Sequence, residues 1–202
     1  NFPSNWPIFW NGGNFTFEPV NETPAMTSNT DPSGYVVSAD TEPEVGFEAF
    51  RAFDQVTTTY WHPSNGATSS WIKFEFPTAL VIRGYVITAP DVLDAGVPIS
   101  WTLEGSLDNS GWFTLDSEIG QPSWELGEKR QFLFTTNTAP YKYYRLVIVN
   151  ATLGTLNHFG IAQIDFYSIP ETSSPATIDD QYFNKGVITG TIKVSNVVTY
   201  NE

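Results

Sequence analysis

Alternation of apolar and polar residues predicts short strands through the middle of the chain. In residues 71–76, three apolar side chains share one face of an extended segment, and polar residues separate them: Ile72, Phe74 and Phe76. Similar segments recur between polar, glycine-containing turns at 80–88, 101–105, 130–135, 142–149 and 161–167. Helical character is limited to a turn or two around 47–53. This pattern predicts an all-β fold, an antiparallel β-sandwich.

The segment before this region has a different character. Residues 1–34 combine proline and glycine with five large aromatic side chains: Trp6, Phe9, Trp10, Phe15 and Phe17. Rings of this kind bury about 150–250 Å² each. We therefore expect an aromatic-rich docking arm, packed either on the same domain or on a partner.

The segment after it divides in two. Residues 169–180 are rich in Pro, Ser and Thr and are predicted to be a linker. Residues 181–202 contain an alternating apolar set, Ile188, Ile192 and Val194. A lone strand is not stable in water, so this one is expected to add to the edge of the sandwich or to pair with another chain. The sandwich is then assigned to residues 35–168, and the two outer segments predict an oligomer within a larger assembly.

Charge and cysteine content exclude several classes of partner and site. Nine Lys and Arg against 22 Asp and Glu give a net charge of −13, which repels the phosphate backbone of nucleic acids. The chain has no cysteine, which excludes disulfides, thiolate zinc sites and a cysteine nucleophile. No apolar run approaches the roughly 20 residues of a membrane span.

Enzymatic motifs are absent from the sequence. It contains no Gly-x-Ser-x-Gly elbow, no His-Glu-x-x-His pair and no phosphate-binding loop. Neighbouring carboxylates such as Asp40, Glu42 and Glu44 are expected by chance in so acidic a chain. The chain is therefore predicted not to be an enzyme.

Eight segments, taken together, resemble the discoidin domain, also called coagulation factor 5/8 type C. They follow the order and spacing of that family at 49–54, 58–62, 71–74, 82–85, 101–108, 112–116, 143–146 and 161–167. The resemblance spans about two-thirds of the chain and implies a galactose-binding-like jelly roll. Members bind glycans, phospholipid or proteins through loops at one end. Residues 24–35 and 127–130 are also similar to discoidin modules of bacteriophage tail and fibre proteins.

Most of the shared residues are expected to be structural. The predicted interior side chains are Trp71, Phe74, Trp101, Leu103, Trp112, Tyr144 and Leu146. Arg145 is expected to pair with a carboxylate such as Asp54 or Asp116.

The resemblance also implies a glycan site that includes His62. In sugar-binding relatives a His after this Trp donates to a galactose hydroxyl, and a neutral imidazole suits a vicinal diol. The alternative is that His62 hydrogen-bonds to backbone at the mouth of the sandwich. Those relatives add an Arg and an Asn from a later loop, where this chain has Asp91, Asp94, Ala95 and Gly96. Galactose specificity is therefore not predicted.

Other loop residues supply the rings and polar groups that a carbohydrate platform requires. They are Tyr60, Trp124, Asn157, His158 and Phe159. Trp124 is equally consistent with a buried corner, and the His158–Phe159 pair with packing.

Calcium is the one cofactor that the resemblance implies. Relatives hold Ca²⁺ with an aspartate that matches Asp54, with oxygens around Thr58, and with a glutamate near the last strand. Here Gln163 stands at that last position, and Gln55 stands where a glycine usually follows the aspartate. One charged ligand fewer weakens affinity for a hard dication.

Three functions follow from these observations. The first is a non-catalytic, virion-associated or otherwise extracellular adhesion module that binds a host-surface glycan through loops at one end of the sandwich. The second is a capsid or tail decoration protein without a carbohydrate ligand, held by other virion or assembly proteins through residues 1–34 and 181–202. The third is a carbohydrate-binding appendage of a larger secreted enzyme.

Overall fold

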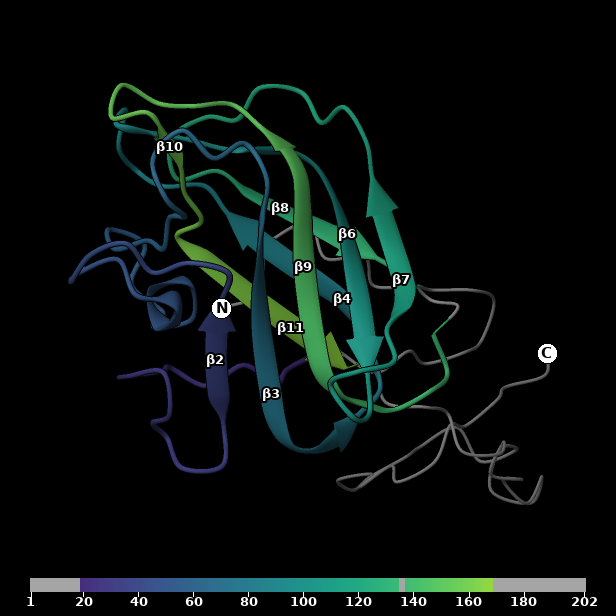
Figure 1. The fold of residues 1–202 in the computed structure, drawn as a ribbon. Helices are drawn as coiled ribbons and strands as arrows, with labels where there is room; N and C mark the ends of the chain where they lie inside the picture. Colours follow the sequence, from purple (N-terminus) through teal and green to yellow (C-terminus); the bar gives the residue numbers. More distant parts are fainter. Residues whose placement is uncertain (1–18, 135–136, 169–202) are drawn as a thin grey trace, which may run out of the picture. The chain divides into compact units, whose positions relative to one another are not determined.

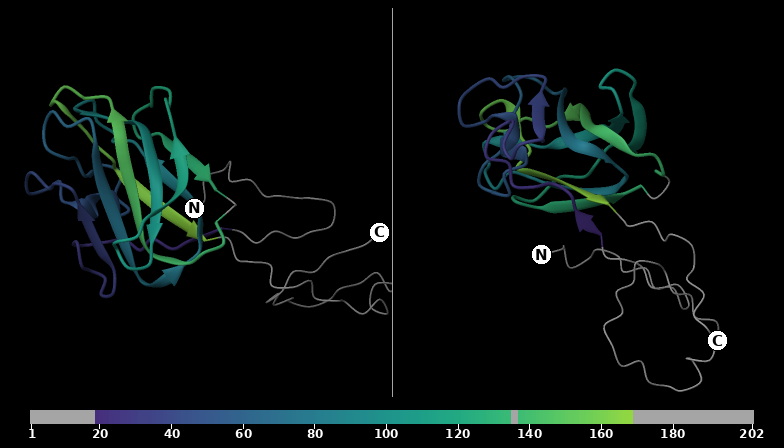
Figure 2. Two further views of the ribbon diagram at one scale, coloured as in Figure 1. Left: turned by 45° about the vertical axis from the view of Figure 1, so that its right-hand side comes forward. Right: turned by 90° about the horizontal axis from the view of Figure 1, so that it is seen from below.

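Two facing sheets form the part of the chain that the computed structural model describes, residues 19–134 and 137–168. One compact unit runs from Asn21 to Ser168. Its larger sheet has the order β2 (Val36–Ala39), β3 (Ser70–Leu80), β9 (Tyr141–Ala151), β6 (Pro98–Ser106) and β7 (Phe113–Glu118). The second has the order β1 (Val20–Asn21), β11 (Gln163–Ser168), β4 (Ile82–Thr88) and β8 (Lys129–Leu133). Figure 1 shows the strands of the two sheets crossing at an angle, and the view from below in Figure 2 shows them as separate layers.

The pairings among β2, β3, β6, β7 and β9, and among β4, β8 and β11, are antiparallel. This confirms the predicted all-β sandwich. The helical turn expected around 47–53 is a short 3₁₀ helix, η1 (Ala49–Ala52). Strands β2 and β7 were not among the predicted segments. Both are edge strands of the larger sheet, and the exposed and half-buried pattern of β7 carries no clean apolar alternation.

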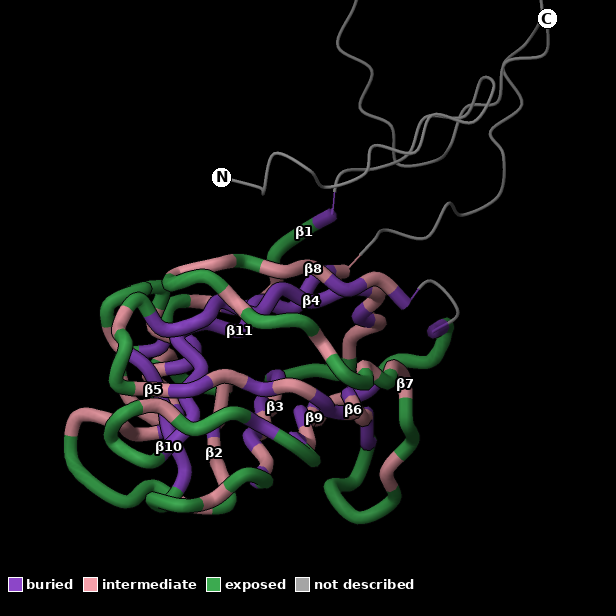
Figure 3. The backbone as a smooth tube through the Cα atoms, turned by 90° about the horizontal axis from the view of Figure 1, so that it is seen from above, coloured by how far each residue is buried: buried purple, intermediate pink, exposed green. Residues whose placement is uncertain are grey.

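The core lies between the sheets and contains the apolar face predicted for residues 71–76. Ile72, Phe74 and Phe76 are all buried. Phe74 pairs in register with Tyr144 of β9, and both rings reach Phe166 of the opposite sheet, at centroid distances of 6.1 and 5.6 Å. Figure 3 shows the buried positions gathered where the two sheets face each other.

Two tyrosine hydroxyls inside this core are paired. The Tyr85 hydroxyl donates to Asp116 Oδ2 at 2.7 Å and accepts a hydrogen bond from Trp101 Nε1 at 2.8 Å. Burial, reinforced by the Asp116 charge, raises the pKa of Tyr85 far above its ordinary value, so the hydroxyl stays a neutral donor. The Tyr144 hydroxyl donates to Leu80 O and accepts from Ile82 N.

Two of the predicted interior side chains are on the outer face instead. Trp71 and Trp112 are half-buried, because Trp71 lies out of phase with the buried Ile72, Phe74 and Phe76. Arg145 packs over the Trp112 ring, 4.0 Å from its centroid. It pairs with Glu104 rather than with either carboxylate that was expected.

The compact unit begins earlier than residue 35, the predicted start of the sandwich. Met26 is buried, and its backbone N–H donates to Phe53 O. Val37 N donates to Asn29 O. The arm's five aromatics, the linker at 169–180 and the strand at 181–202 lie outside the described residues, so their docking and assembly roles stay predictions. Among the described residues, no helix is long and apolar enough to cross a membrane.

Candidate functional site

Several loops meet at the end of the unit where β6 begins. A short parallel pair, β5 (Ala95–Gly96) and β10 (His158–Phe159), joins two of them. Gly96 is required there, because a Cβ would lie 2.1 Å from Thr152 O. The pairing sets His158 opposite Ala95 and directs its ring toward the loop that contains Tyr60 and His62.

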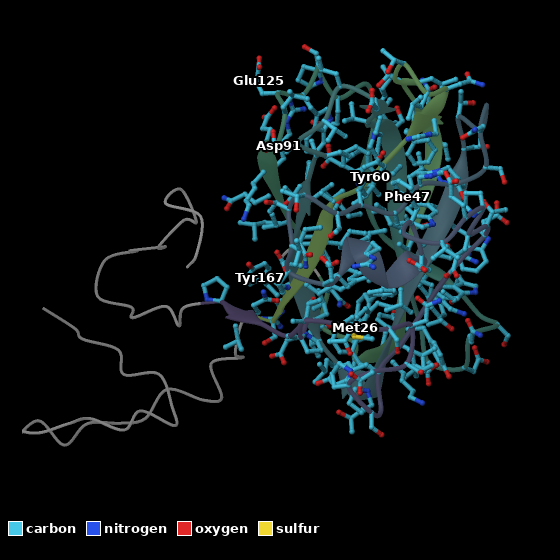
Figure 4. All side chains as sticks on the ribbon, turned by 90° about the vertical axis from the view of Figure 1, so that its left-hand side faces the viewer. Met26, Phe47, Tyr60, Asp91, Glu125 and Tyr167 are labelled. Atoms are coloured by element: carbon cyan, nitrogen blue, oxygen red, sulfur yellow. The ribbon has the colours of Figure 1, made fainter. Side chains whose placement is uncertain are left out.

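Four rings form a cluster at this end: Phe47, Tyr60, His62 and His158. The two imidazoles are stacked, with centroids 3.9 Å apart and an interplanar angle of 10°. The Phe47 ring lies 4.5 Å from His62 and 4.9 Å from Tyr60, and Figure 4 shows Phe47 and Tyr60 next to each other. A Cβ on Gly160 would come within 2.7 Å of the Tyr60 ring, so the glycine lets that ring approach the backbone.

Hydrogen bonds fix the orientation of both imidazoles. His62 Nδ1 lies 2.7 Å from Pro63 O, so Nδ1 carries the hydrogen and donates it. His62 Nε2 is buried without a hydrogen-bond partner and lies 3.4 Å from Glu44 Oε1. His158 faces Tyr60 Oη through Nε2 and Asn65 Oδ1 through Nδ1, at 3.4 and 3.3 Å.

The electrostatic environment of the ring cluster is acidic. Burial lowers the pKa of His158, and the neighbouring His62 lowers it further, while Glu44 and Asp94 act in the opposite direction. Burial and the charges of Asp94 and Glu44 raise the pKa of the Tyr60 hydroxyl. Both carboxylates therefore act on the same two rings.

The loops that contain these rings, and the loop around Asp94, also carry exposed side chains of two kinds. Three apolar ones are Val45, Leu93 and Leu156, which are 92%, 74% and 54% exposed. The same loops contain four exposed polar side chains: Glu44, Asn65, Asp94 and Asn157. Backbone hydrogen bonds connect their loops, from Leu156 N to Asp94 O and from Gly66 N to Asn157 O. This end therefore offers apolar contacts and hydrogen-bonding groups together.

The structure brings together part of the predicted glycan set. Tyr60, His62, His158, Asp94 and Asn157 belong to connected loops. His62 is only 1% exposed and bonds to backbone, which matches the alternative of a loop-stabilising residue. Phe47, Glu44 and Asn65 were not predicted as site residues. Residues 40–48 show no periodic spacing of apolar side chains, and their closely spaced carboxylates are expected by chance in so acidic a chain.

Trp124, Phe159 and Asp91 do not join the ring cluster of Phe47, Tyr60, His62 and His158. Trp124 Nε1 donates to Pro98 O, and its ring lies 6.3 Å from that of Trp101, as expected for a corner residue. Phe159 is fully buried. Asp91 is next to Gly127, and Figure 4 shows it beside Glu125 and away from Phe47.

The residues that matched a calcium site do not fit a dication. Asp54 Oδ2 accepts from Thr59 Oγ1 at 2.7 Å and lies 3.5 Å from the Arg51 guanidinium. Thr58 is exposed, so Thr59 and not Thr58 is the partner of Asp54. A cation is therefore already beside the main carboxylate.

The two glutamines complete this network with amide groups. Gln55 N donates to Gln163 Oε1, and the side-chain amides of Gln55 and Gln163 donate to Asp165 Oδ1 at 2.8 and 3.0 Å. Gln55 has a φ of +61°, a conformation that favours the glycine of the relatives. No group of three or more His, Cys, Asp or Glu suited to a metal occurs among the described residues.

Comparison with known proteins gives structural matches alone. No protein-family model matches the chain, and neither does any curated protein. Chitosan-binding module 1 of a chitosanase/glucanase from Paenibacillus sp. IK-5 is 22% identical, with a TM-score of 0.57, over 74% of this chain and 99% of that one. A CBM32 module from Clostridium perfringens, solved with GalNAc-β-1,3-galactose, is 18% identical, with a TM-score of 0.55, over 67% and 96%.

An F5/8 type C domain from Bacteroides fragilis is also similar. It is 18% identical, with a TM-score of 0.55, over 72% of this chain and 99% of that domain. These matches agree with the antiparallel sandwich and with the resemblance of the eight sequence segments. The described unit therefore has the galactose-binding-like fold of the discoidin, or F5/8 type C, domains and of the CBM32 modules.

Proposed function

We propose that this chain is a non-catalytic glycan-binding module whose site is the loop end around Phe47, Tyr60 and His158. The observation that carries the proposal is the convergence there of exposed apolar side chains with exposed carboxylate and amide groups. Sugars present C–H faces and hydroxyls, so they require both kinds of group. The names of the similar structures, which include modules for chitosan and a galactoside complex, support the same class of ligand.

A binding role is supported over a catalytic one by the state of the histidines. His62 and His158 are both buried, and each has a ring nitrogen facing a protein oxygen. Neither is placed as an accessible general base. The exposed groups at this end suit recognition instead.

The context in which the module works is part of the proposal. The chitosan-binding module is named as derived from a chitosanase/glucanase, and other similar modules are named as parts of family 31 glycoside hydrolases. These names favour an appendage of a larger secreted enzyme. The virion-associated adhesion role and the extracellular location remain predictions of the sequence, as does the decoration protein without a ligand.

A matched pair of leucine truncations tests the location of the site. Leu156 at the loop end is 54% exposed, and Leu107, which follows the other end of β6, is 60% exposed. A glycan array with the full chain identifies a binding sugar, and calorimetry then measures its affinity. We expect Leu156→Ala to weaken binding about 5- to 10-fold through lost apolar contact, and Leu107→Ala to leave it unchanged. Silence across the array contradicts the proposal and favours the decoration role.

A further inference from the structure

One proton distinguishes two states of the contact between His62 and Glu44. His62 Nδ1 carries the ring hydrogen and donates it to Pro63 O, so a neutral ring presents a lone pair at Nε2. That atom is buried without a hydrogen-bond partner and lies 3.4 Å from Glu44 Oε1, which is also an acceptor. Two facing acceptors are unfavourable, whereas a second hydrogen on the ring turns the same contact into a charge-assisted hydrogen bond. A proton on Nε2 thus pairs both groups without any ligand.

The stacked neighbour, His158, is already paired in its neutral form. Its Nδ1 lies 3.3 Å from Asn65 Oδ1, an oxygen that only accepts, so Nδ1 carries the hydrogen. Its Nε2 faces the Tyr60 hydroxyl at 3.4 Å, which leaves no lone pair free on the ring. Burial and then the neighbouring His62 lower the pKa of His158, and two charged imidazoles would repel strongly at a centroid distance of 3.9 Å. The stacked pair therefore holds one proton, and His62 is the ring that receives it.

Asp94 and Tyr60 also face the stacked rings, but neither enters this contact. Asp94 Oδ1 already accepts a hydrogen bond from Thr155 Oγ1 at 2.9 Å. Burial, followed by the charges of Asp94 and Glu44, raises the pKa of the Tyr60 hydroxyl, so that group stays neutral. Neither carboxylate forms an ion pair with a Lys or Arg of the described residues. Glu44 is therefore the carboxylate at this end whose partner depends on the protonation of His62.

We propose that His62 and Glu44 form a pH-dependent switch that weakens glycan binding in acid. The inference rests on the proposed glycan-binding function and names the regulation of the same site. At neutral pH the Glu44 side chain is 61% exposed and accepts a hydrogen bond from a sugar hydroxyl. On acidification, in the range where imidazoles titrate, His62 Nε2 gains a hydrogen and donates it to Glu44 Oε1. The ion pair neutralises the carboxylate and holds it against the buried ring, where it no longer serves the sugar.

The turn that contains Glu44 is built so that the carboxylate can change partner. Val45 at its tip is 92% exposed, and a Cβ at Gly46 would meet no atom within 4 Å. Phe47 anchors the other side of the turn, because its N–H donates to Glu44 O at 3.4 Å and its ring lies 4.5 Å from that of His62. The Glu44 side chain therefore moves without disturbing the packing of Phe47.

Calorimetry at two pH values tests the switch with the full chain and a neutral sugar identified on the glycan array. We expect the dissociation constant at about pH 5.5 to exceed that at about pH 8 by about 5- to 10-fold, the size of one lost hydrogen bond. Glu44→Gln has no carboxylate to pair with His62, so its affinity should be the same at both pH values. The exposed position of the side chain means that this variant should keep its melting temperature at neutral pH.

Asp94→Asn is the matched control for Glu44→Gln. It makes the same charge change at the carboxylate that already has its own donor in Thr155, so it should keep the pH dependence. A pH dependence that survives in Glu44→Gln, or one that Asp94→Asn abolishes, overturns the inference.

Imidazole NMR tests the switch without any sugar, because the chain contains just two histidines, His62 and His158. In the full chain labelled with ¹⁵N at histidine, we expect one ring to gain a hydrogen at Nε2 between about pH 8 and 5, while the other ring stays neutral. His158→Gln should leave the titrating ring in the spectrum, which assigns it to His62. Protonation of His158 before His62, or of neither ring, overturns the inference.

The affinities also separate the switch from the proposed function. Equal affinity at both pH values, with binding still weakened by Leu156→Ala, overturns the switch and leaves glycan binding in place. No binding of any sugar on the array, at either pH, overturns the glycan function and its regulation together.

Discussion

Replacement of His62 by alanine should destabilise the fold, and the structure gives the size of the effect. The ring is 1% exposed, stacks on His158 at 3.9 Å and contacts Phe47 at 4.5 Å. Truncation of a buried side chain of this size costs about 3 kcal/mol through lost burial and the cavity that it leaves. Loss of the bond to Pro63 O costs about 1 kcal/mol, and removal of the unpaired Nε2 returns about 1 kcal/mol. We therefore expect the free energy of unfolding to fall by about 3 kcal/mol.

Thermal and urea unfolding, followed by tryptophan fluorescence, measure this change. A loss of 3 kcal/mol corresponds to a fall of about 6–12 °C in the melting temperature of a unit of this size. Val45→Ala, in the loop that contains Glu44, is the control, because Val45 is 92% exposed and its truncation should have almost no effect. His62→Phe keeps a stacked ring in place of the imidazole, so it should stay closer to the wild-type stability. A loss below about 0.5 kcal/mol in His62→Ala would refute the packed arrangement of the imidazoles.

Three further predictions concern the hydroxyl network, acid and calcium. Tyr85→Phe should lower the free energy of unfolding by about 2–4 kcal/mol in urea titrations, because Trp101 Nε1 is left buried without an acceptor; an unchanged midpoint would contradict the network. The pKa of His158 is lowered on folding, so the unfolded chain binds more protons, and stability should fall as the pH drops below about 6.5. His158→Gln should flatten that dependence, whereas a wild-type protein that gains stability on acidification over this range would disprove the assignment. Calcium or EDTA should leave the melting temperature unchanged, because amides and Arg51 already occupy the carboxylates; a rise with calcium would show that Gln55 and Gln163 do not exclude the ion.

The sandwich was predictable where one face of a strand is buried. Alternation within residues 71–76 placed Ile72, Phe74 and Phe76 in the core correctly, and the same period placed Trp71 outside. The expectation that Trp71 is interior came from its match to the discoidin pattern and from its residue type. The two-residue alternation of the strand, which places Trp71 on the opposite face from Ile72 and Phe74, predicted its position correctly. The edge strand β7 has no fully buried residue. Its sequence therefore shows no alternation of apolar and polar side chains from which the strand could be predicted.

The site was predictable only in part, because long-range packing creates it. The discoidin resemblance singled out His62, and residue type in the loops singled out Tyr60 and His158. Their arrangement depends on the β5–β10 pairing, which stacks His158 on a residue far away in the sequence. Phe47 and Glu44 belong to a loop without a period, so no local pattern indicated that they reach His62.

The location of the ligand tests the central claim most directly. Chemical-shift mapping by NMR, with a sugar identified on the array, reports which backbone amides respond to binding. Our account predicts that the largest shifts cluster at Phe47, Tyr60 and Asn157 and saturate with one affinity. Shifts concentrated on the outer face of the larger sheet around Trp71 and Trp112, with the loop end unaffected, would contradict it.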